Sequence, residues 1–268
     1  MCTRVVGMWR RLAERLGVYR LYEYLLDREV RGGEIPRHVA FILDGNRRWA
    51  RRRGFPPWMG HRFGAEKVDE VLDWCYDLGV VTVTLYVLST ENLERRSKEE
   101  LENIFGILRE KIDELASSEE LHRRQVRVKF IGDIKRLPVD IQEKMRELEE
   151  RTRSYNKRYL NIAVAYGGRH EILEAVRQIA VEVRSGRLSP EEIDEKLFAK
   201  YLYTGDEPHP EPDLVIRTSG EVRISNFLLW QIAYSELVFL DVYWPDFRRI
   251  DFLRAIRTYQ SRQRRKGA

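Results

Sequence analysis

A run of charged and small residues, Asp44-Gly45-Asn46-Arg47-Arg48-Trp49, directly follows a short apolar segment of the chain. A carboxylate beside a glycine at the start of a helix can hold Mg²⁺, while nearby backbone N–H groups bind phosphate oxygens. The arginines of this run, continued at positions 51–53, add charge-assisted hydrogen-bond donors. A helix N-terminus followed by a basic, solvated face has the same pattern, so these residues leave both interpretations open.

A second group of polar residues occupies positions 217–226 and contains Arg217, Ser219, Gly220, Arg223 and Ser225. The planar guanidinium of arginine matches the geometry of phosphate oxygens, so two arginines and two serines around a glycine predict a diphosphate clamp. Together with the carboxylate of the first run, this clamp predicts two phosphate sites, one of them with a metal.

Small polar residues follow two more apolar segments, as Ser89-Thr90-Glu91-Asn92 and as Gly167-Gly168-Arg169-His170-Glu171. The first of these runs suits the rim of a ligand site. It equally suits an ordinary turn in which a serine or asparagine side chain caps the backbone.

Several other chemistries are excluded by the motifs that the sequence lacks. The chain has no G-x-x-x-x-G-K-[ST] phosphate loop, no G-x-G-x-x-G after a strand and no G-x-S-x-G nucleophile motif. His170-Glu171 begins like a zinc protease motif, but Glu174 occupies the position of the second histidine. Cys2 and Cys75 can form neither a disulfide framework nor a paired zinc site, which favours a reducing compartment.

Strand-like and helix-like segments alternate along the chain. Strands are predicted over residues 37–43, 80–88, 126–131, 160–166, 214–216 and 237–242, and helices over 65–78, 97–115, 139–155, 170–184 and 250–264, with a further helix start at Ser189-Pro190. Strands separated by helices imply a mainly parallel β-sheet flanked by helices, a single-domain α/β fold. Ligands of such sheets bind beyond the carboxyl ends of the strands, where the polar runs described above lie.

The composition limits the partners and the location of the protein. The formal net charge of +5 points to anionic partners or to a slightly basic, solvated surface. No apolar run is long enough to cross a bilayer, and the N-terminus lacks the apolar core of a signal peptide. We therefore expect a cytoplasmic protein, with possible peripheral association at the membrane.

The first 34 residues differ from the rest of the chain. Met8, Trp9, Leu12, Leu16, Tyr19 and Tyr22 recur at helical spacing among arginines, which predicts an N-terminal amphipathic helical extension over residues 1–34. Such a helix can rest on a membrane through its Trp/Tyr face, or it can pack on the surface of the protein itself. The sequence does not decide between these two alternatives.

Five ordered blocks of the sequence resemble the signature blocks of the cis-prenyltransferases, the family that includes undecaprenyl and dehydrodolichyl diphosphate synthases. These blocks are residues 38–50, Gly60-His61, residues 85–92, Tyr166 to Arg169 and residues 217–231, followed by Glu236 and Trp244-Pro245. The match runs from about Ile35 to the C-terminus, so residues 35–268 are expected to form the catalytic domain. The Asp-Gly-Asn-Arg-Arg and Arg-Thr-Ser-Gly-Glu-Val-Arg blocks look more like the eukaryotic and archaeal branch than the bacterial one.

The resemblance implies a magnesium-dependent enzyme that adds isopentenyl diphosphate repeatedly to an allylic primer, farnesyl or geranylgeranyl diphosphate. Asp44 would position Mg²⁺, with Glu236 helping to complete the metal environment. His61 would assist proton handling, and Asn46 with Ser89 would lie near the proton lost from the isopentenyl unit. The long-chain polyprenyl diphosphate product would occupy a hydrophobic tunnel, for which Leu85, Val87, Ile104, Phe105 and Leu108 are candidate walls, although plain core residues have the same pattern.

The resemblance also implies substrate contacts. The allylic diphosphate would bind Arg48 and the backbone of residues 45–48, and the isopentenyl diphosphate would bind Arg217, Arg223 and Ser225. Further substrate-binding residues that the resemblance suggests are Gly45, Arg47, Trp49, Asn92 and Arg95. Arg265 and Gly267 look like the Arg-x-Gly motif that reaches across a homodimer to the partner's isopentenyl diphosphate.

The chain departs from the bacterial pattern of the family at a few positions. Arg47 replaces a glycine, Leu93 replaces a tryptophan, and Val222 stands where bacterial members have a histidine near the metal. Pro57 occupies a position where many relatives carry an arginine for the allylic diphosphate. These departures leave the identity of the primer and the details of the metal environment open.

Two other functions compete with catalysis. A non-catalytic partner subunit of a heteromeric prenyltransferase would resemble the family near its C-terminus, but such subunits tend to lack the Asp-Gly-Asn block and the paired arginines that this chain has. A nucleic-acid binder would use the basic segment 257–266, but Tyr259 is the only aromatic residue interleaved there and no nucleic-acid motif is present. We therefore expect no nucleic-acid partner.

Overall fold

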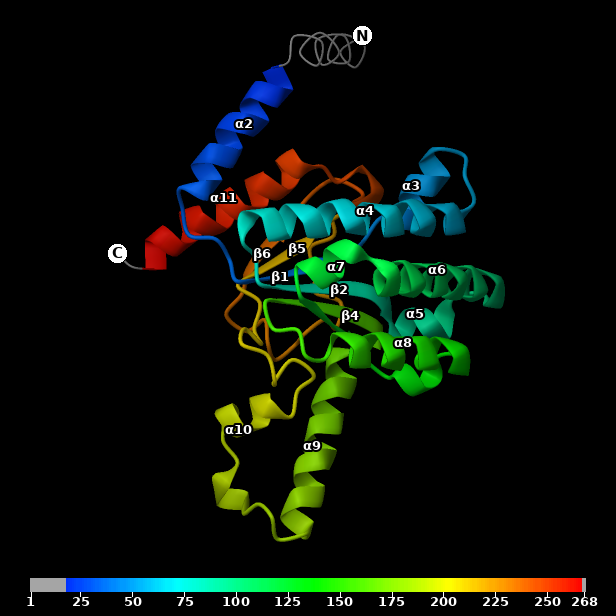
Figure 1. Cartoon of the computed structure of the whole chain (residues 1–268), viewed down its shortest axis with the longest axis vertical. Helices are drawn as coiled ribbons and strands as arrows, with labels where there is room; N and C mark the ends of the chain where they lie inside the picture. The colour runs from blue at the N-terminus through cyan, green and yellow to red at the C-terminus, as the bar shows by residue number, and fades with distance from the viewer. Residues whose placement is uncertain (1–17, 267–268) are drawn as a thin grey trace.

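The computed structural model describes residues 18–266, with the side chains of residues 19–262. Within this range six parallel strands form one sheet in the order β3-β4-β2-β1-β5-β6 (Figure 1). The strands are β1 (His38–Ile42), β2 (Thr82–Ser89), β3 (Val126–Ile131), β4 (Arg158–Tyr166), β5 (Leu214–Arg217) and β6 (Glu236–Phe239). The predicted parallel α/β sheet is confirmed.

Helices flank this sheet. They are α2 (Val18–Arg31), α3 (Asn46–Arg52), α4 (Pro57–Leu78), α5 (Thr90–Arg95), α6 (Lys98–Ser117), α7 (Glu119–Arg123), α8 (Val139–Thr152), α9 (Gly168–Arg184), α10 (Glu195–Lys200) and α11 (Arg249–Lys266). Figure 1 shows α4, α6 and α8 together along one side of the sheet, whereas α9 and α10 project away from it.

The alternation of side chains along β1 divides the core into two layers. Val39 and Phe41 belong to the larger buried cluster, which is filled by α4, α6, α8 and α11, and Phe41 packs edge-on against Trp244. Ala40 and Ile42 belong to the smaller cluster on the other face, with the buried Phe227 and Leu228 from the segment after β5. Because both faces are covered, the strands read as nearly continuous apolar runs.

The structure differs from the predicted elements mainly at their ends. Helix α4 begins at Pro57, eight residues before the predicted start, with proline in its first turn as helices tolerate. Ser189-Pro190 starts only a short 3₁₀ turn, Pro190–Glu192, although the reciprocal capping hydrogen bonds expected of its sequence are present. A cap fixes where a helix starts, but an apolar stripe has to follow for the helix to continue.

Helix α2 has two distinct faces. Its inner face packs on α11, with Leu26 and Val30 buried and with Asp27 bound by Arg249 at 2.5 Å. On its outer face Leu21, Tyr24 and Leu25 are more than half exposed. The structure therefore supports packing on the protein itself for the inner face, while the outer face keeps the alternative of an external contact open. Met8, Trp9, Leu12 and Leu16 lie outside the described residues.

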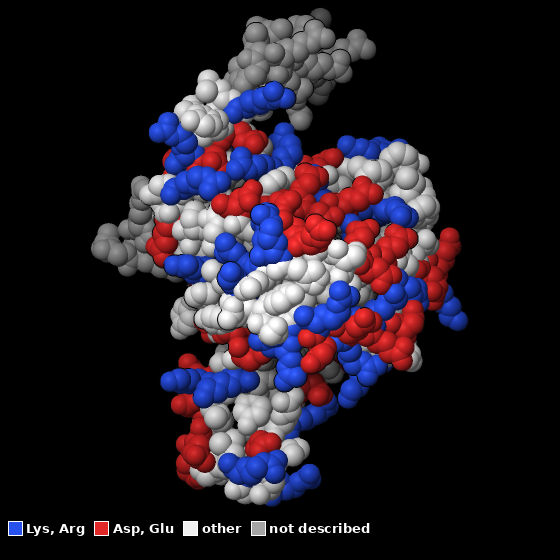
Figure 2. All heavy atoms as spheres, viewed as in Figure 1, with Lys and Arg blue, Asp and Glu red and all other residues white. Residues whose placement is uncertain are grey.

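The surface is rich in charged groups of both signs. Figure 2 shows acidic and basic side chains interspersed over the viewed face, so the net charge of +5 is not gathered in one patch there. In the part of the chain that the structure describes, no helix has the length and apolar character needed to cross a membrane.

Candidate active site

The carboxyl ends of β1, β2 and β5 open into a polar cleft of about 860 Å³. Nine of the predicted site residues line it: Asp44, Asn46, His61, Ser89, Asn92, Arg95, Arg217, Arg223 and Ser225. Most of the predicted site residues therefore share one cleft, as the position of ligand sites in parallel sheets requires.

Asp44 is held between two arginine side chains. Arg217 Nη2 donates to Asp44 Oδ2 at 2.7 Å, and Arg48 Nη2 donates to Asp44 Oδ1 at 3.2 Å. Burial raises the pKa of Asp44, but the hydrogen bond and charge of Arg217, with smaller contributions from Ser219 and Arg48, outweigh burial and lower that pKa below its usual value. Asp44 is therefore an anion at neutral pH, as a metal ligand must be.

Gly45 makes the turn from β1 into α3 possible. Its φ of 105° lies in the left-handed region, and a Cβ at this position would come within 2.6 Å of the Tyr243 ring. A larger residue would therefore push α3 away from the cleft. Because α3 begins at Asn46, the first backbone N–H groups of this helix lie next to Asp44.

Arg217 connects the two predicted phosphate sites. Its guanidinium is only 5% exposed, and Nη1 donates to Ser225 Oγ at 2.7 Å and also to the backbone carbonyl of Arg223. Its Nε has no partner among the described residues. The loop that carries Ser225 has positive φ angles at Ser225 and Asn226, which curl it around the arginine. The two arginine clusters that the sequence presents as separate sites thus meet at Asp44.

Glu221 provides a second link between the clusters. It accepts from Arg48 Nη1 at 3.1 Å and lies 2.9 Å from Arg223 Nη2. The Arg223 side chain is 64% exposed. Glu221 therefore links Arg48, which does not line the cleft, to Arg223, which does.

Ser89 and Asn92 form the opposite rim of the cleft. Ser89 caps α5 by accepting from the backbone N–H of Asn92 at 3.0 Å, so the ordinary turn that its sequence allows is present. The same two residues line the cleft, together with Arg95. Asn226 Nδ2 donates to Glu91 at 2.9 Å and ties this rim to the arginine loop.

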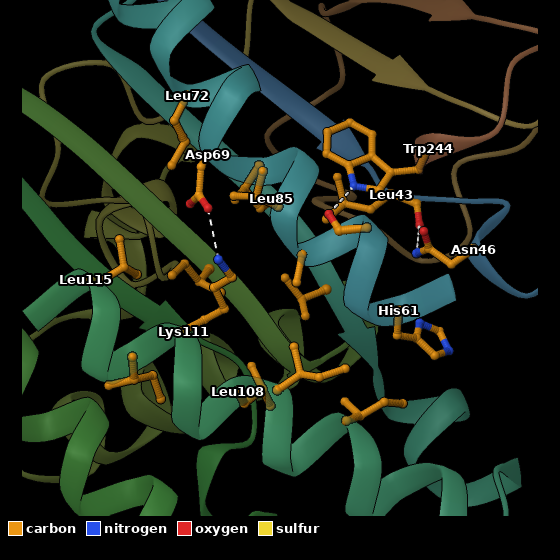
Figure 3. Close-up of a pocket in the computed structure, with 18 of the residues that line it drawn as sticks. Leu43, Asn46, His61, Asp69, Leu72, Leu85, Leu108, Lys111, Leu115 and Trp244 are labelled. Atoms are coloured by element: carbon orange, nitrogen blue, oxygen red, sulfur yellow. Dashed lines mark hydrogen bonds and ion pairs between the residues drawn. The ribbon is translucent and has the colours of Figure 1, made fainter. Parts of the chain in front are cut away.

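An apolar cavity of about 110 Å³ lies between the sheet and helices α4 and α6, next to the polar cleft. Figure 3 shows Asn46 and His61 at one side of this cavity and Asp69, Lys111 and Leu115 at the other. Of the candidate tunnel walls, Leu85, Val87, Ile104 and Leu108 line the cavity. Phe105 is packed in the core instead.

Five residues line both the polar cleft and the apolar cavity: Leu43, Asn46, His61, Val87 and Arg96. We call this group the neck. Within it, Asn46 Nδ2 donates to the Leu43 carbonyl at 3.1 Å, whereas the buried Asn46 Oδ1 has no partner among the described residues. Burial, the largest cause, lowers the pKa of His61, so this ring is neutral at neutral pH.

Trp49, a predicted substrate-binding residue, is buried and lies outside the cleft in this structure. The indole is 5% exposed, packs 4.9 Å from the ring of Phe63 and donates to Asp246 Oδ1 at 2.9 Å. It lies on the face of α3 that packs against α4, and it does not line the cleft. Arg47 does not line the cleft either, and its Nε lies 3.5 Å from Glu100 at the neck.

The prediction that Glu236 shares a metal environment with Asp44 does not hold within one chain. Glu236 begins β6 and pairs in register with Leu214, the first residue of β5, so it lies towards the amino ends of the strands. Asp44 follows the carboxyl end of β1. Glu236 instead accepts from Arg262 Nη1 at 3.0 Å. Gly267 and the side chain of Arg265 lie outside what the structure describes.

The cleft fits a Mg²⁺ site in which the substrate supplies most of the metal ligands. The described residues contain no cluster of three or more His, Cys, Asp or Glu side chains able to hold a metal alone. Mg²⁺ commonly binds one or two carboxylates together with substrate phosphates and water. The ionised, partly exposed Asp44 at the cleft wall meets that requirement.

Sequence reasoning missed two charged residues, Arg96 in the neck and Glu100 directly behind it. Arg96 lines both the cleft and the cavity, and its Nε lies 3.6 Å from Glu100 Oε1. Ser97 caps α6 by accepting from the backbone N–H of Glu100 at 3.2 Å, which accounts for Glu100 as a helix-start residue. The spacing of four residues between Arg96 and Glu100 was the available signal, but that spacing is common on solvated helices.

The sequence of this chain is similar to known prenyl diphosphate synthases over nearly its whole length. A family model described as undecaprenyl diphosphate synthase matches residues 42–267. A tritrans,polycis-undecaprenyl-diphosphate synthase (geranylgeranyl-diphosphate specific) of Methanopyrus kandleri is 56% identical over 250 residues, which cover 93% of this chain and 91% of the relative. The protein of the same description from Methanocaldococcus jannaschii is 52% identical over 264 residues, which cover 98% and 94%.

Solved structures show the same fold. Lavandulyl diphosphate synthase from Lavandula x intermedia, in complex with dimethylallyl diphosphate, matches with a TM-score of 0.78 and 37% identity, covering 84% of this chain and 95% of that one. A probable undecaprenyl diphosphate synthase from Campylobacter jejuni matches with a TM-score of 0.69 and 30% identity, covering 88% and 99%.

The family match includes β5, the loop that follows it and the residues after β1, which build the arginine-lined cleft described above. The relatives share about half of their residues with this chain over nearly its full length. The chain therefore belongs to the undecaprenyl diphosphate synthase family of cis-prenyltransferases and is a prenyltransferase.

Proposed function

We propose that this enzyme adds isopentenyl diphosphate repeatedly to geranylgeranyl diphosphate and so makes a long-chain polyprenyl diphosphate. The observation that carries the proposal is the neck, where an arginine-lined cleft opens into an apolar cavity. An allylic diphosphate has these two parts, a charged head and an apolar tail. The primer is proposed because relatives at 56% and 52% identity are described as geranylgeranyl-diphosphate specific.

The charged walls of the cleft suit two diphosphate groups. Arg48 and the first backbone N–H groups of α3 would hold the allylic diphosphate, and Arg217, Arg223 and Ser225 would hold the isopentenyl diphosphate. Loss of diphosphate from an allylic carbon leaves a carbocation-like centre and a highly charged leaving group. Fixed guanidinium groups stabilise that developing charge without reorganising. Asp44 lies between the two sets of arginines and would orient both heads through the metal.

Mg²⁺ bound at Asp44 would neutralise diphosphate oxygens and so make diphosphate a better leaving group. The protein contributes the carboxylate, kept ionised by Arg217, and the arginines that complete the charge balance. Glu236 of the same chain lies too far along the sheet to take part.

The neck would handle the proton that each addition releases. Attack by the isopentenyl double bond is followed by loss of one proton from that unit. Asn46 has an unpartnered Oδ1 at this place, and the neutral ring of His61 lines the same neck. Ser89 lies on the opposite rim, and its Oγ already accepts a hydrogen bond from the backbone N–H of Asn92. Its hydroxyl can therefore contribute to proton handling only as a hydrogen-bond donor.

The apolar cavity would hold the growing chain. Burial of hydrocarbon contributes roughly 0.8 kcal/mol per CH₂-sized group, so each added unit is favoured while it stays out of water. Helices α4 and α6 form the wall along which the growing chain would lie.

Two features of the assembly belong to the same proposal. We propose a homodimer in which Arg265 and Gly267 of one subunit complete the isopentenyl diphosphate site of the other. We also propose that the exposed Leu21, Tyr24 and Leu25 on α2 rest on the membrane that receives the product.

One experiment tests the catalytic proposal. Purified protein is incubated with Mg²⁺, radiolabelled isopentenyl diphosphate and either farnesyl or geranylgeranyl diphosphate, and the products are sized by chromatography. We expect long-chain products, made faster from the geranylgeranyl primer. A chain that binds diphosphates but never elongates either primer would instead be a non-catalytic partner subunit.

A further inference from the structure

The carboxylate of Glu100 lies directly behind the neck. Its side chain, in the first turn of α6, is 12% exposed. One oxygen, Oε1, is 3.2 Å from His61 Nε2, 3.5 Å from Arg47 Nε and 3.6 Å from Arg96 Nε. Among the described residues, the charged side chains that act on the His61 ring are Arg47 of α3, Arg96 directly after α5, and Glu100 of α6.

The ionisation of Glu100 fixes the position of the proton on His61. The hydrogen bond from His61 is the largest cause that lowers the pKa of Glu100, and the charges of Arg96 and Arg47 act in the same direction against burial. An ionised carboxylate can only accept a hydrogen bond, so His61 Nε2 carries the hydrogen. In a neutral ring Nδ1 is then unprotonated and is available as a proton acceptor.

The neck is where that acceptor is needed. Each elongation converts an allylic diphosphate and isopentenyl diphosphate into a longer allylic diphosphate, free diphosphate and one proton. The bond from C1 to the leaving diphosphate breaks, a carbon–carbon bond forms, and the proton leaves the isopentenyl unit. His61 lines both the cleft that takes the heads and the cavity that takes the tail, so the reacting carbons come close to its ring.

We propose that Glu100 is a positioning residue that holds His61 as the neutral tautomer with Nδ1 unprotonated, and that it balances the charges of Arg47 and Arg96 behind the neck. This inference rests on the proposed elongation reaction. A carboxylate that orients a catalytic imidazole acts in the same way in other enzymes, without touching the substrate.

Four variants separate this role from a structural one. Glu100→Gln keeps the size and the capping-box chemistry of this helix position, since glutamine is accepted there as well as glutamate. Glu99→Gln is the matched control, one residue earlier in the same helical turn, where the side chain is exposed and does not line the cleft or the cavity. His61→Gln and the double variant His61→Gln/Glu100→Gln complete a double-mutant cycle.

Glu100→Gln is expected to lower kcat about tenfold or more, the scale on which acid–base positioning matters, while Glu99→Gln keeps wild-type turnover. In the His61→Gln background Glu100→Gln should have little further effect, because there is no ring left to position. Glu100 raises the pKa of His61, so the acidic limb of the kcat–pH profile should move to lower pH in Glu100→Gln. Additive losses in the double variant would overturn the proposal.

A spectroscopic measurement gives a readout that does not depend on activity. In ¹⁵N-labelled protein the wild-type His61 should show a protonated Nε2 and an unprotonated Nδ1 at neutral pH, and Glu100→Gln should show a mixture of tautomers. A wild-type ring protonated at Nδ1 would contradict the inference. If the wild type elongates a primer while Glu100→Gln matches it, the inference alone fails. If the wild type elongates neither primer, the proposed function fails while the tautomer is still measured.

Discussion

Asp44 carries a negative charge that the surrounding residues maintain, since Arg217 and Arg48 each donate to one of its oxygens. Asp44→Asn keeps the shape and a hydrogen-bond acceptor but removes the charge that would hold Mg²⁺. We expect turnover to fall by about 10²–10³-fold, the range seen when one preorganised charge contact at a reaction centre is lost. Near-normal elongation by a variant with an unchanged thermal unfolding curve would contradict the proposed role.

A substitution of Arg223 distinguishes the two substrate sites better than a substitution of Arg217. Arg217 is buried against Asp44, so Arg217→Ala would disturb both diphosphate sites, whereas Arg223 is mostly exposed and bonds only at the edge of the cleft. Arg223→Ala should weaken isopentenyl diphosphate by about 1.5–3 kcal/mol, the contribution of a charge-assisted contact. KM values for both substrates measure this. Equal weakening of the allylic primer would show that the two clamps are assigned to the wrong substrates.

Glu207 is a buried carboxyl group on the side of the sheet away from the cavity. Burial, opposed by the hydrogen bond from Asn161, raises its pKa from 4.5 to about 7. A raised pKa in an acid means that folding favours the protonated form. The stabilisation is therefore fully present below about pH 4.5 and is lost as pH rises through about 7.

Glu207→Gln should remove this pH dependence, since glutamine is never charged and still accepts from Asn161. The variant should be more stable than the wild type at pH 8 by up to roughly 3 kcal/mol, about 1.36 kcal/mol for each pKa unit, and nearly equal at pH 4.5. Denaturant unfolding at the two pH values measures the difference. A constant difference between the two proteins across this range would contradict the raised pKa.

The sequence predicts the residues whose own side chains would contact substrate or metal. It does not predict Glu100, which acts by positioning another side chain, His61. Asp44 and Arg217 were predictable because each follows an apolar strand, and strand ends converge in a parallel sheet. Glu100 was not, because it reaches the neck only through the packing of α4 against α6. Trp49 and Glu236 were assigned from the resemblance, but the face of α3 and the direction of β6 place them elsewhere.

At the scale of elements, α4 and α6 enclose the apolar cavity. Two ion pairs between these helices differ in whether they line this cavity. Asp69 and Lys111 lie 2.9 Å apart and line the cavity at the end away from the neck (Figure 3). Arg62 and Glu110 lie 2.8 Å apart and do not line it. The first pair is thus placed to close the path of a growing chain, and the second serves as its control.

Asp69→Leu/Lys111→Leu should shift the product distribution towards longer chains by one or more isoprene units, because an apolar passage replaces a polar one. Arg62→Leu/Glu110→Leu should leave the distribution unchanged. A difference of about 1.4 kcal/mol changes a product ratio tenfold, so even a modest change in the cost of passage is visible in sized products. An equal shift in both variants would mean that product length follows general loosening of the two helices.

Element types were more predictable than element ends. The strand 126–131 was predicted to the residue, since a β-branched run between turn signals leaves little choice. Helix α4 was predicted too short because its first two turns carry Pro57, Gly60 and Gly64, which weaken a helix by propensity. Here tertiary packing requires them, since a Cβ on Gly60 would come 2.1 Å from the Asn46 carbonyl oxygen at the turn into α3.

At the scale of the whole molecule, two features of the single chain, the cleft and helix α9, bear on its assembly. Among the described residues the cleft is lined by two carboxylates, Asp44 at the end of β1 and Glu91 on the opposite rim, and Asp44 is the one that Arg217 binds. Helix α9 projects from the sheet (Figure 1). Its Leu173, Val176 and Val181 side chains are exposed to solvent. Exposed apolar side chains on a projecting helix favour burial against another subunit. Both observations fit the proposed homodimer.

The last prediction follows from a site completed by its neighbour. If Arg265 and Gly267 only add solubility, deleting residues 265–268 should change nothing. If they close over the partner's isopentenyl diphosphate, arginine supplies charge and glycine lets the backbone approach. A dimer of Asp44→Asn chains and a dimer of truncated chains should then each have little activity. A mixed dimer would contain one site with an intact Asp44 and an intact tail from the partner.

The two variants are mixed in equal amounts after reversible dissociation, and heterodimers are verified by differently tagged chains. Activity should then return to about one quarter of the wild type, because half of the dimers are mixed and each of these has one complete site. Mixing two differently tagged Asp44→Asn preparations is the control. Verified heterodimers without recovered activity would show that each chain completes its own site.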